Sequence, residues 1–206
     1  MNVADALRNR LSHASLDGVA TMDLAEVHEL VRLAQQAPSS FNIQFTRYIA
    51  VTDPELKTRL REVSINQAKI TGAATVFVLL GDLEAHVPYA ERMRGAAAAG
   101  HVPQATADYL VNAATQSYSV PARAREESAR SVGLSGMALM LAAEERGWAS
   151  CPMIGFDPNA YRTILGYDER YVALMVVAVG KPGAAAGARK PRLPVEAVLR
   201  VNGGGF

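Results

Sequence analysis

The first regular pattern along the chain is a helical one between Asp23 and Pro38. Apolar residues recur there at helical spacing, at Val27, Leu30, Val31 and Ala34. This spacing predicts a helix with one apolar face. Asp23 is placed to cap its first turn, with Glu26 as the second half of a capping box, and Pro38 ends it.

The other segments alternate between extended and helical patterns. Apolar runs predict strands at Arg47–Val51, Thr75–Leu80, Trp148–Met153 and Val172–Val179. Helices are predicted at Asn2–Leu11, after Asp53-Pro54, at Asp157–Leu165 and from Pro121 to Gly147. The last of these is apolar most of the way round, so we expect it to be buried on several sides, either centrally or in a dimer.

Two stretches are less regular. Residues 83–120 are rich in Ala and Tyr and are broken by Gly95, Gly100 and Pro103, which predicts irregular helices. Residues 183–206 have the Gly, Ala and Pro content of an extended arm. The whole pattern predicts an α+β fold, or a loose three-layer α/β arrangement, in a single domain spanning residues 1–206.

Composition narrows the functional classes. Of 206 residues, 50% are hydrophobic and 20% are charged, which is typical of a globular core. The net charge of +1 gives no basic excess for nucleic acid. No secretory signal is evident, and the apolar runs are much shorter than the roughly twenty residues of a membrane helix. With Cys151 as its one cysteine, the chain is expected in the reducing cytoplasm, without a membrane partner.

Several common motifs are missing. The sequence contains no dinucleotide-binding G-x-G-x-x-G after a strand, no phosphate loop and no G-x-S-x-G elbow. The four histidines are scattered and have no metal-ligand spacing, so no metal site is predicted.

Polar groups instead recur at the edges of apolar elements. They are Arg8-x-Arg10-x-Ser12, the stretch from Gln35 to Phe45, Asn66-x-x-Lys69, the turn in "CPMIGFD" and Lys190-Pro191-Arg192. Arginines can bind a phosphate, and Asn and Gln offer both donor and acceptor to a heterocycle. If their segment is helical, Asn66 and Lys69 share one face. The set suits a large anionic cofactor.

Four stretches carry a family resemblance. In order they are "APSSFNIQF", "GLSGMALMLAAEERGWASCPMIGFDPNAYRTILGY", "VALMVVAVGKP" and "RKPRLP". They resemble the FMN-dependent nitroreductase family over about residues 7 to 196. The resemblance implies a three-layer α/β/α fold, with a central mixed, mostly antiparallel sheet flanked by helices. It also implies a homodimer with FMN sites at the subunit interface, and a C-terminal arm that reaches the partner.

The resemblance assigns the cofactor-binding residues. Arg10 and Ser12 would contact the FMN phosphate or ribityl chain, with Lys190 and Arg192 closing on the phosphate. Asn66 would bind the pyrimidine edge and Lys69 would lie near flavin N1 and O2. The full set is Arg10, Ser12, Pro38, Ser39, Ser40, Asn42, Gln44, Asn66, Lys69, Met153, Ile154, Gly155, Lys190 and Arg192.

Pro38, Ser39, Ser40 and Asn42 would reach the flavin of the other subunit, although a polar turn that merely caps a helix is the alternative. Met153, Ile154 and Gly155 would lie beside flavin N5. For Lys69 the alternative is a solvated helix lysine.

The substrate pocket is expected near the variable segment 83–120, with Phe41, Tyr109 and Tyr118 as candidates. Leu11 and Ala14 stand where many relatives are basic, and Phe45 and Thr46 stand where a tryptophan is common. Cys151 is expected to be an ordinary buried thiol, with a redox role as the alternative.

The resemblance also implies the reaction. NADH or NADPH would deliver hydride to flavin N5, and a nitroaromatic, quinone or enone would then take the electrons in a ping-pong cycle. One alternative is the same flavin site with another reaction, such as reduction of small aldehydes or unsaturated acids, dehalogenation or flavin degradation. The other is a module that binds FMN without turnover.

Overall fold

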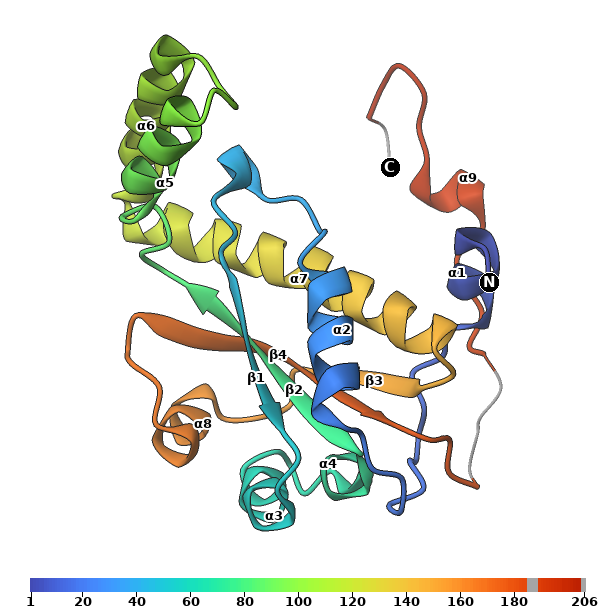
Figure 1. Ribbon diagram of the computed structural model, residues 1–206. Coiled ribbons are helices and arrows are strands. Elements are labelled where there is room, and N and C mark those ends of the chain that lie inside the picture. The colour runs from blue at the N-terminus through green and yellow to red at the C-terminus, as the bar shows by residue number, and fades with distance from the viewer. Residues whose placement is uncertain (185–188, 205–206) are drawn as a thin grey trace.

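The computed structural model describes residues 1–184 and 189–204, and its centre is a four-stranded sheet in the order β1-β2-β4-β3 (Figure 1). The strands are β1 (Thr46–Val51), β2 (Thr75–Asp82), β3 (Ala149–Met153) and β4 (Tyr171–Gly180). Each neighbouring pair is antiparallel. Within the described ranges, parallel pairing is confined to one bridge between Ser12 and Ser150. The predicted α+β class with a mostly antiparallel sheet is confirmed.

Helices cover both faces of this sheet, which gives three layers. On one face lie α2 (Leu24–Ala34) and α7 (Pro121–Glu145), and on the other lie α3 (Pro54–Glu62), α4 (Ala68–Gly72) and α8 (Pro158–Leu165) (Figure 1). Strand β2 is buried at every position because both of its faces are covered. Each interface has its own apolar cluster, centred on Leu30 and Leu139 in one and on Leu60 and Tyr161 in the other.

The two ends of α7 carry different structures. At one end α5 (Tyr89–Ala98) and α6 (Gln104–Tyr118) pack together as regular helices (Figure 1). The expectation of irregular helices was therefore wrong: Gly100 and Pro103 lie in the connection between two helices rather than inside one. At the other end lie α1 (Val3–Asn9) and the tail, which contains the single turn α9 (Val195–Val198). Residues 185–188 and 205–206 of the predicted arm are outside the described residues.

The helix boundaries follow the capping residues, with one exception. Asp23 Oδ1 accepts a hydrogen bond from the Glu26 backbone N–H at 2.7 Å, as predicted. The Glu26 carboxylate, however, accepts from Trp148 Nε1 at 2.8 Å and pairs with Arg146, so it does not complete the capping box. None of the helices in the described part of the chain combines the length and the apolar content needed to cross a membrane.

Candidate functional site

A cavity of about 440 Å³ lies where the two ends of the chain meet. It is lined by Arg10, Leu11, Ser12, His13, Ala14, Lys69, Cys151, Arg189, Lys190 and Arg192. Five predicted cofactor residues, Arg10, Ser12, Lys69, Lys190 and Arg192, are thus brought together from both termini and from α4.

The charge of this cavity is one-sided. Of the described residues that line it, five are Arg or Lys and none is a carboxylate. Burial lowers the pKa of the Arg10 guanidinium, and the positive charges of Arg189 and Arg192 lower it further. Cations crowded in this way favour a bound dianion such as a phosphate monoester. Leu11 and Ala14 line the same cavity, so the two positions at which the resemblance leads us to expect basic residues do lie at this site.

Arg189 and His13 were missed by the sequence reasoning. Arg189 Nη2 donates to the backbone carbonyls of Leu7 and Arg10, both at 2.8 Å, and so fastens the tail to the end of α1. The backbone N–H of His13 donates to the carbonyl of Ser150 at 3.1 Å, which fixes the N-terminal segment on β3. The basic run Arg189-Lys190-Pro191-Arg192 was the available signal for the first of these residues.

Cys151 forms part of the cavity wall, next to Lys69. Its side chain is only 5% exposed. Burial raises the pKa of the thiol, and the nearby Lys69 ammonium opposes this more weakly. The thiol is therefore held in its unreactive protonated form.

A second group of predicted residues lies around Gly155. Asn66 has a left-handed backbone (φ 51°), and α4 begins after it at Ala68, so Asn66 and Lys69 do not share a helical face. Gln67 Nε2 donates to the Gly155 carbonyl at 3.2 Å, which joins the two turns. A Cβ at Gly155 would lie 3.1 Å from Ile65 Cδ1, so only glycine fits here without a shift.

The two residues before Gly155 differ in their environment. Met153 closes β3 with a side chain that is 6% exposed, whereas the Ile154 side chain is 79% exposed. Ile154 is thus available to a ligand over the turn, and Met153 packs in the core.

The polar stretch that follows α2 is a tight, internally bonded turn around η1 (Ser40–Asn42). Ser39 Oγ accepts from the Gln44 backbone N–H at 2.8 Å, and Asn42 Oδ1 accepts from Gln44 Nε2 at 3.4 Å. Phe41, Asn42 and Gln44 all have left-handed backbones, with φ of 52°, 54° and 60°.

Ser40 is held by two helices. Tyr118 Oη donates to Ser40 Oγ at 2.7 Å, and the Ser40 backbone N–H donates to Glu127 Oε1 at 3.4 Å. The Tyr118 ring also packs edge-on against Phe41, in a core where it is 8% exposed. Of the residues predicted for the substrate pocket, Tyr118 and Phe41 therefore lie at this turn, while Tyr109 is 70% exposed on α6.

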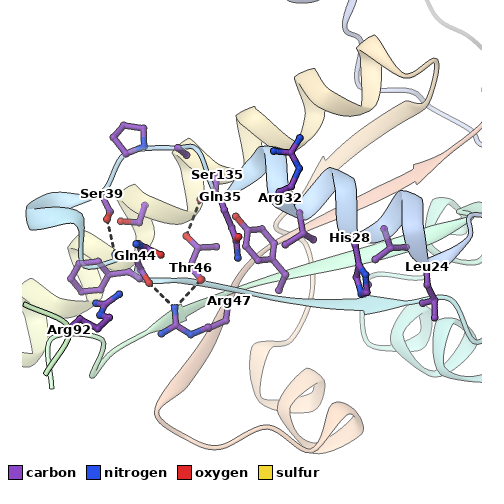
Figure 2. Close-up of a pocket in the computed structure, with 18 residues that line it drawn as sticks. Leu24, His28, Arg32, Gln35, Ser39, Gln44, Thr46, Arg47, Arg92 and Ser135 are labelled. Carbon is purple, nitrogen blue, oxygen red and sulfur yellow. Dashed lines mark hydrogen bonds between the residues drawn. The ribbon is translucent and has the colours of Figure 1, made fainter. Parts of the chain in front are cut away.

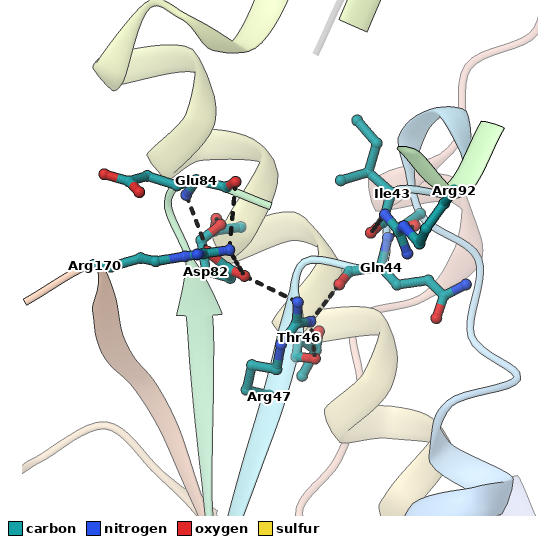
Figure 3. A network of polar contacts seen from close by, with 10 residues as sticks. Ile43, Gln44, Thr46, Arg47, Asp82, Glu84, Arg92 and Arg170 are labelled. Carbon is teal, nitrogen blue, oxygen red and sulfur yellow. Dashed lines mark hydrogen bonds and ion pairs between the residues drawn. The ribbon is translucent and has the colours of Figure 1, made fainter. Parts of the chain in front are cut away.

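Arginines fix the end of this turn against the sheet (Figure 3). Arg47 Nη1 donates to the Gln44 carbonyl at 2.6 Å, and Arg92 Nη2 donates to the Ile43 carbonyl at 2.7 Å. Arg47 is itself held by the fully buried carboxylate of Asp82 at 2.9 Å. These hydrogen bonds therefore hold the turn, with its left-handed residues, in one conformation.

A larger cavity of about 720 Å³ runs between α2 and β1. Figure 2 shows Ser39 and Gln44 at one end of it and Leu24 and His28 at the other. Phe45 and Thr46, which stand where the resemblance leads us to expect a tryptophan, also line it.

Backbone strain occurs in two of the segments that carry predicted site residues, the turn after α2 and the segment before α4. Among the described residues, six that are not glycine have a positive φ, and five of them are Phe41, Asn42, Gln44, Ile65 and Asn66. Such conformations cost free energy and tend to persist where function needs them.

Comparisons with known proteins identify the family of this chain. The model of the Nitroreductase family matches residues 7–181. MhqN of Bacillus subtilis, which carries the name of an NAD(P)H nitroreductase, is 36% identical over 172 residues, covering 82% of this chain and 81% of MhqN. The structure named as the nitroreductase ydfN of B. subtilis superposes with a TM-score of 0.91 at 29% identity, over 96% of this chain and 97% of that one. One from Exiguobacterium sibiricum, also named as a nitroreductase and solved with FMN, gives 0.89 at 25% identity, over 98% of both chains. This chain belongs to the nitroreductase family.

Proposed function

We propose that this protein is an FMN-dependent oxidoreductase that uses NADH or NADPH. The observation that carries the proposal is the cavity in which, among the described residues, five cations meet without a carboxylate. Bound FMN would supply the redox chemistry, accepting hydride at N5 and passing electrons to a small acceptor such as a nitroaromatic, quinone or enone in alternating half-reactions. The chain's own residues bind and orient the cofactor and tune its electrostatics.

The residues around the cation cavity fit the cofactor's two parts. Arg10, Lys190 and Arg192 would bind the phosphate together with Ser12. Lys69, which lines the same cavity, would face the N1–O2 edge, where a fixed cation favours the reduced form. Asn66 would bind the pyrimidine edge.

The turn at Gly155 would lie beside the reactive side of the ring. The Gly155 backbone is open to close approach because it has no Cβ, and the exposed Ile154 would cover the ring beside N5. Met153 supports this turn from the core.

The separation of the two groups supports a homodimer with shared FMN sites. The turn at Ser40 contacts Tyr118 of α6, whereas the cation cavity is lined by residues of the N-terminal segment and the C-terminal tail, and α6 and α1 lie at opposite ends of α7 (Figure 1). One flavin can use both groups only if they come from different subunits. The tail, which we propose reaches the partner, exposes five large apolar side chains in its described part: Leu193, Val195, Val198, Leu199 and Val201. A partner surface would remove them from water.

The proposal also covers the cellular compartment and the place where the acceptor binds. The single buried Cys151 suits the reducing cytoplasm. The acceptor would enter near Phe41, beside the helices α5 and α6 of segment 83–120.

The test compares FMN with riboflavin, which lacks the phosphate. Titration followed by flavin fluorescence should show FMN bound at least about tenfold tighter, since a charge-assisted contact contributes about 1.5–3 kcal/mol. Arg10→Ala should remove most of that preference, and Arg8→Ala, an exposed neighbour on α1, should keep it. Anaerobic NADH or NADPH should then bleach the bound flavin. Equal affinity for both flavins, or a flavin that neither donor bleaches, would contradict the proposal.

A further inference from the structure

Arg61 makes an unusual set of contacts at the end of α3. Its Nε donates to Asn66 Oδ1 at 2.7 Å and its Nη1 donates to Thr71 Oγ1 at 3.3 Å. Both acceptors are neutral. Among the described residues Arg61 has no ion-pair partner, although its side chain is only partly exposed. A positive charge is therefore placed directly behind the Asn66 amide.

This contact fixes the orientation of the Asn66 side chain. A guanidinium can only donate, so the atom that faces Arg61 must be the carbonyl oxygen. The amide nitrogen is then turned outward, and it has no acceptor among the described residues. Hydrogen bonds on both sides of Asn66 hold its backbone in place: the Val63 carbonyl accepts from the Asp157 N–H at 3.0 Å, and Gln67 Nε2 donates to the Gly155 carbonyl at 3.2 Å.

We propose that Arg61 is a positioning residue that makes Asn66 a hydrogen-bond donor to a carbonyl oxygen of the bound flavin. This inference rests on the proposed function, and it specifies which atom of Asn66 meets the ring. The pyrimidine edge offers two carbonyl acceptors and one N–H donor. The outward nitrogen can serve only the acceptors. The charge of Arg61 polarises the amide and strengthens this donor. A stronger donor stabilises the electron-rich reduced ring more than the oxidised ring, so Arg61 raises the reduction potential of the bound flavin.

The test measures the two-electron midpoint potential of the purified FMN-bound protein, together with FMN affinity. Arg61→Leu should weaken binding of reduced FMN relative to oxidised FMN about tenfold, which is a fall of about 30 mV. Arg59→Leu is the matched control, because it removes the same charge from an exposed position on the same helix. It should leave the potential unchanged.

The variant Asn66→Asp separates an effect on the flavin potential from an effect on the free energy of unfolding. The new carboxylate would form an ion pair with Arg61, so the free energy of unfolding should hold or rise. The outward donor would be lost, so the potential should fall.

The inference and the proposed function fail in different ways. If the unaltered protein does not bind FMN, the proposed function is wrong before any potential is measured. If FMN binds but Arg61→Leu shifts the potential no more than Arg59→Leu, the positioning role is wrong. A wild-type potential in Asn66→Asp would also overturn it.

Discussion

Arg170 binds the carboxylate of Asp82 at two points: Nε lies 2.6 Å from Oδ1 and Nη2 lies 2.8 Å from Oδ2. The same carboxylate accepts from Arg47, which in turn holds the Gln44 carbonyl (Figure 3). A fully buried carboxylate at the end of the central strand thus connects two arginines to the strained turn at Ser40.

Replacement of the Asp82 carboxylate should destabilise the folded protein. Asp82→Asn leaves Arg47 and Arg170 without their shared counter-charge, and we expect a loss of about 3 kcal/mol in the free energy of unfolding, measured with urea. This expected loss lies at the low end of the range for breaking a buried ion pair, because both guanidiniums are partly exposed. Glu29→Gln, which breaks the surface pair with Arg32, should cost less than about 1 kcal/mol. Equal losses in the two variants would show that the network contributes no more than a surface pair.

The strain at Ile65 should be measurable. Ile65 is β-branched, 82% exposed and left-handed, so Ile65→Gly removes a steric penalty while losing little buried area. We expect a gain of about 0.5–1 kcal/mol in the free energy of unfolding. Val19→Gly, at an equally exposed position without a positive φ, should lose about as much through backbone entropy. The same sign of change in both variants would argue against strain at Ile65.

Glu26 should contribute to stability in a pH-dependent way. The hydrogen bond from Arg146 lowers the pKa of the Glu26 carboxyl below its usual 4.5, with Trp148 adding to it against the effect of burial. A folded-state pKa below the unfolded value stabilises the protein above the unfolded pKa, and this contribution is lost as pH falls through the folded pKa. The difference in urea midpoint between the unaltered protein and Glu26→Gln should be constant from pH 7 to about pH 5 and shrink below pH 4.5. A difference that grows toward low pH would contradict this sign.

Cys151 should be chemically inert in the folded protein. Because burial raises the pKa of its thiol, reaction with a disulfide reagent at pH 7 should be slow in buffer and complete in urea. Cys151→Ala should keep FMN binding and anaerobic bleaching by the donor. Rapid modification of the native thiol, or loss of bleaching in Cys151→Ala with FMN still bound, would instead indicate a redox role.

The fold was largely predictable because its signals are local. Pro121 and Gly147 bound the long helix as expected, with Gly147 left-handed at φ 74°. The strand at Thr75 was recognisable because every position is apolar or small until Asp82. Segment 83–120 was misjudged, since the glycine and proline that separate α5 from α6 look the same in sequence as breaks within one irregular helix.

The site was predictable only in part because side-chain pairing depends on distant segments. The motifs identified Arg10, Lys69 and Arg192, which do share one cavity. Nothing in the sequence indicates that Arg61 bonds the Asn66 oxygen, or that Asn66 lies outside the helix of Lys69. The two contacts of Arg189 to α1 join residues almost a whole chain apart, which no local pattern can reveal.

Those contacts of Arg189 make the start of the C-terminal tail a close neighbour of the N-terminal helix α1. Met1 lies beside α7, where its ammonium is 3.9 Å from Glu145 Oε1, and the C-terminal tail begins on the same side. An affinity tag fused to the N-terminus would therefore emerge on the side of the molecule where the cation cavity lies, and an acidic linker there would compete with a bound phosphate for the cations. Preparations that are to be compared for flavin content should have their tags cleaved first.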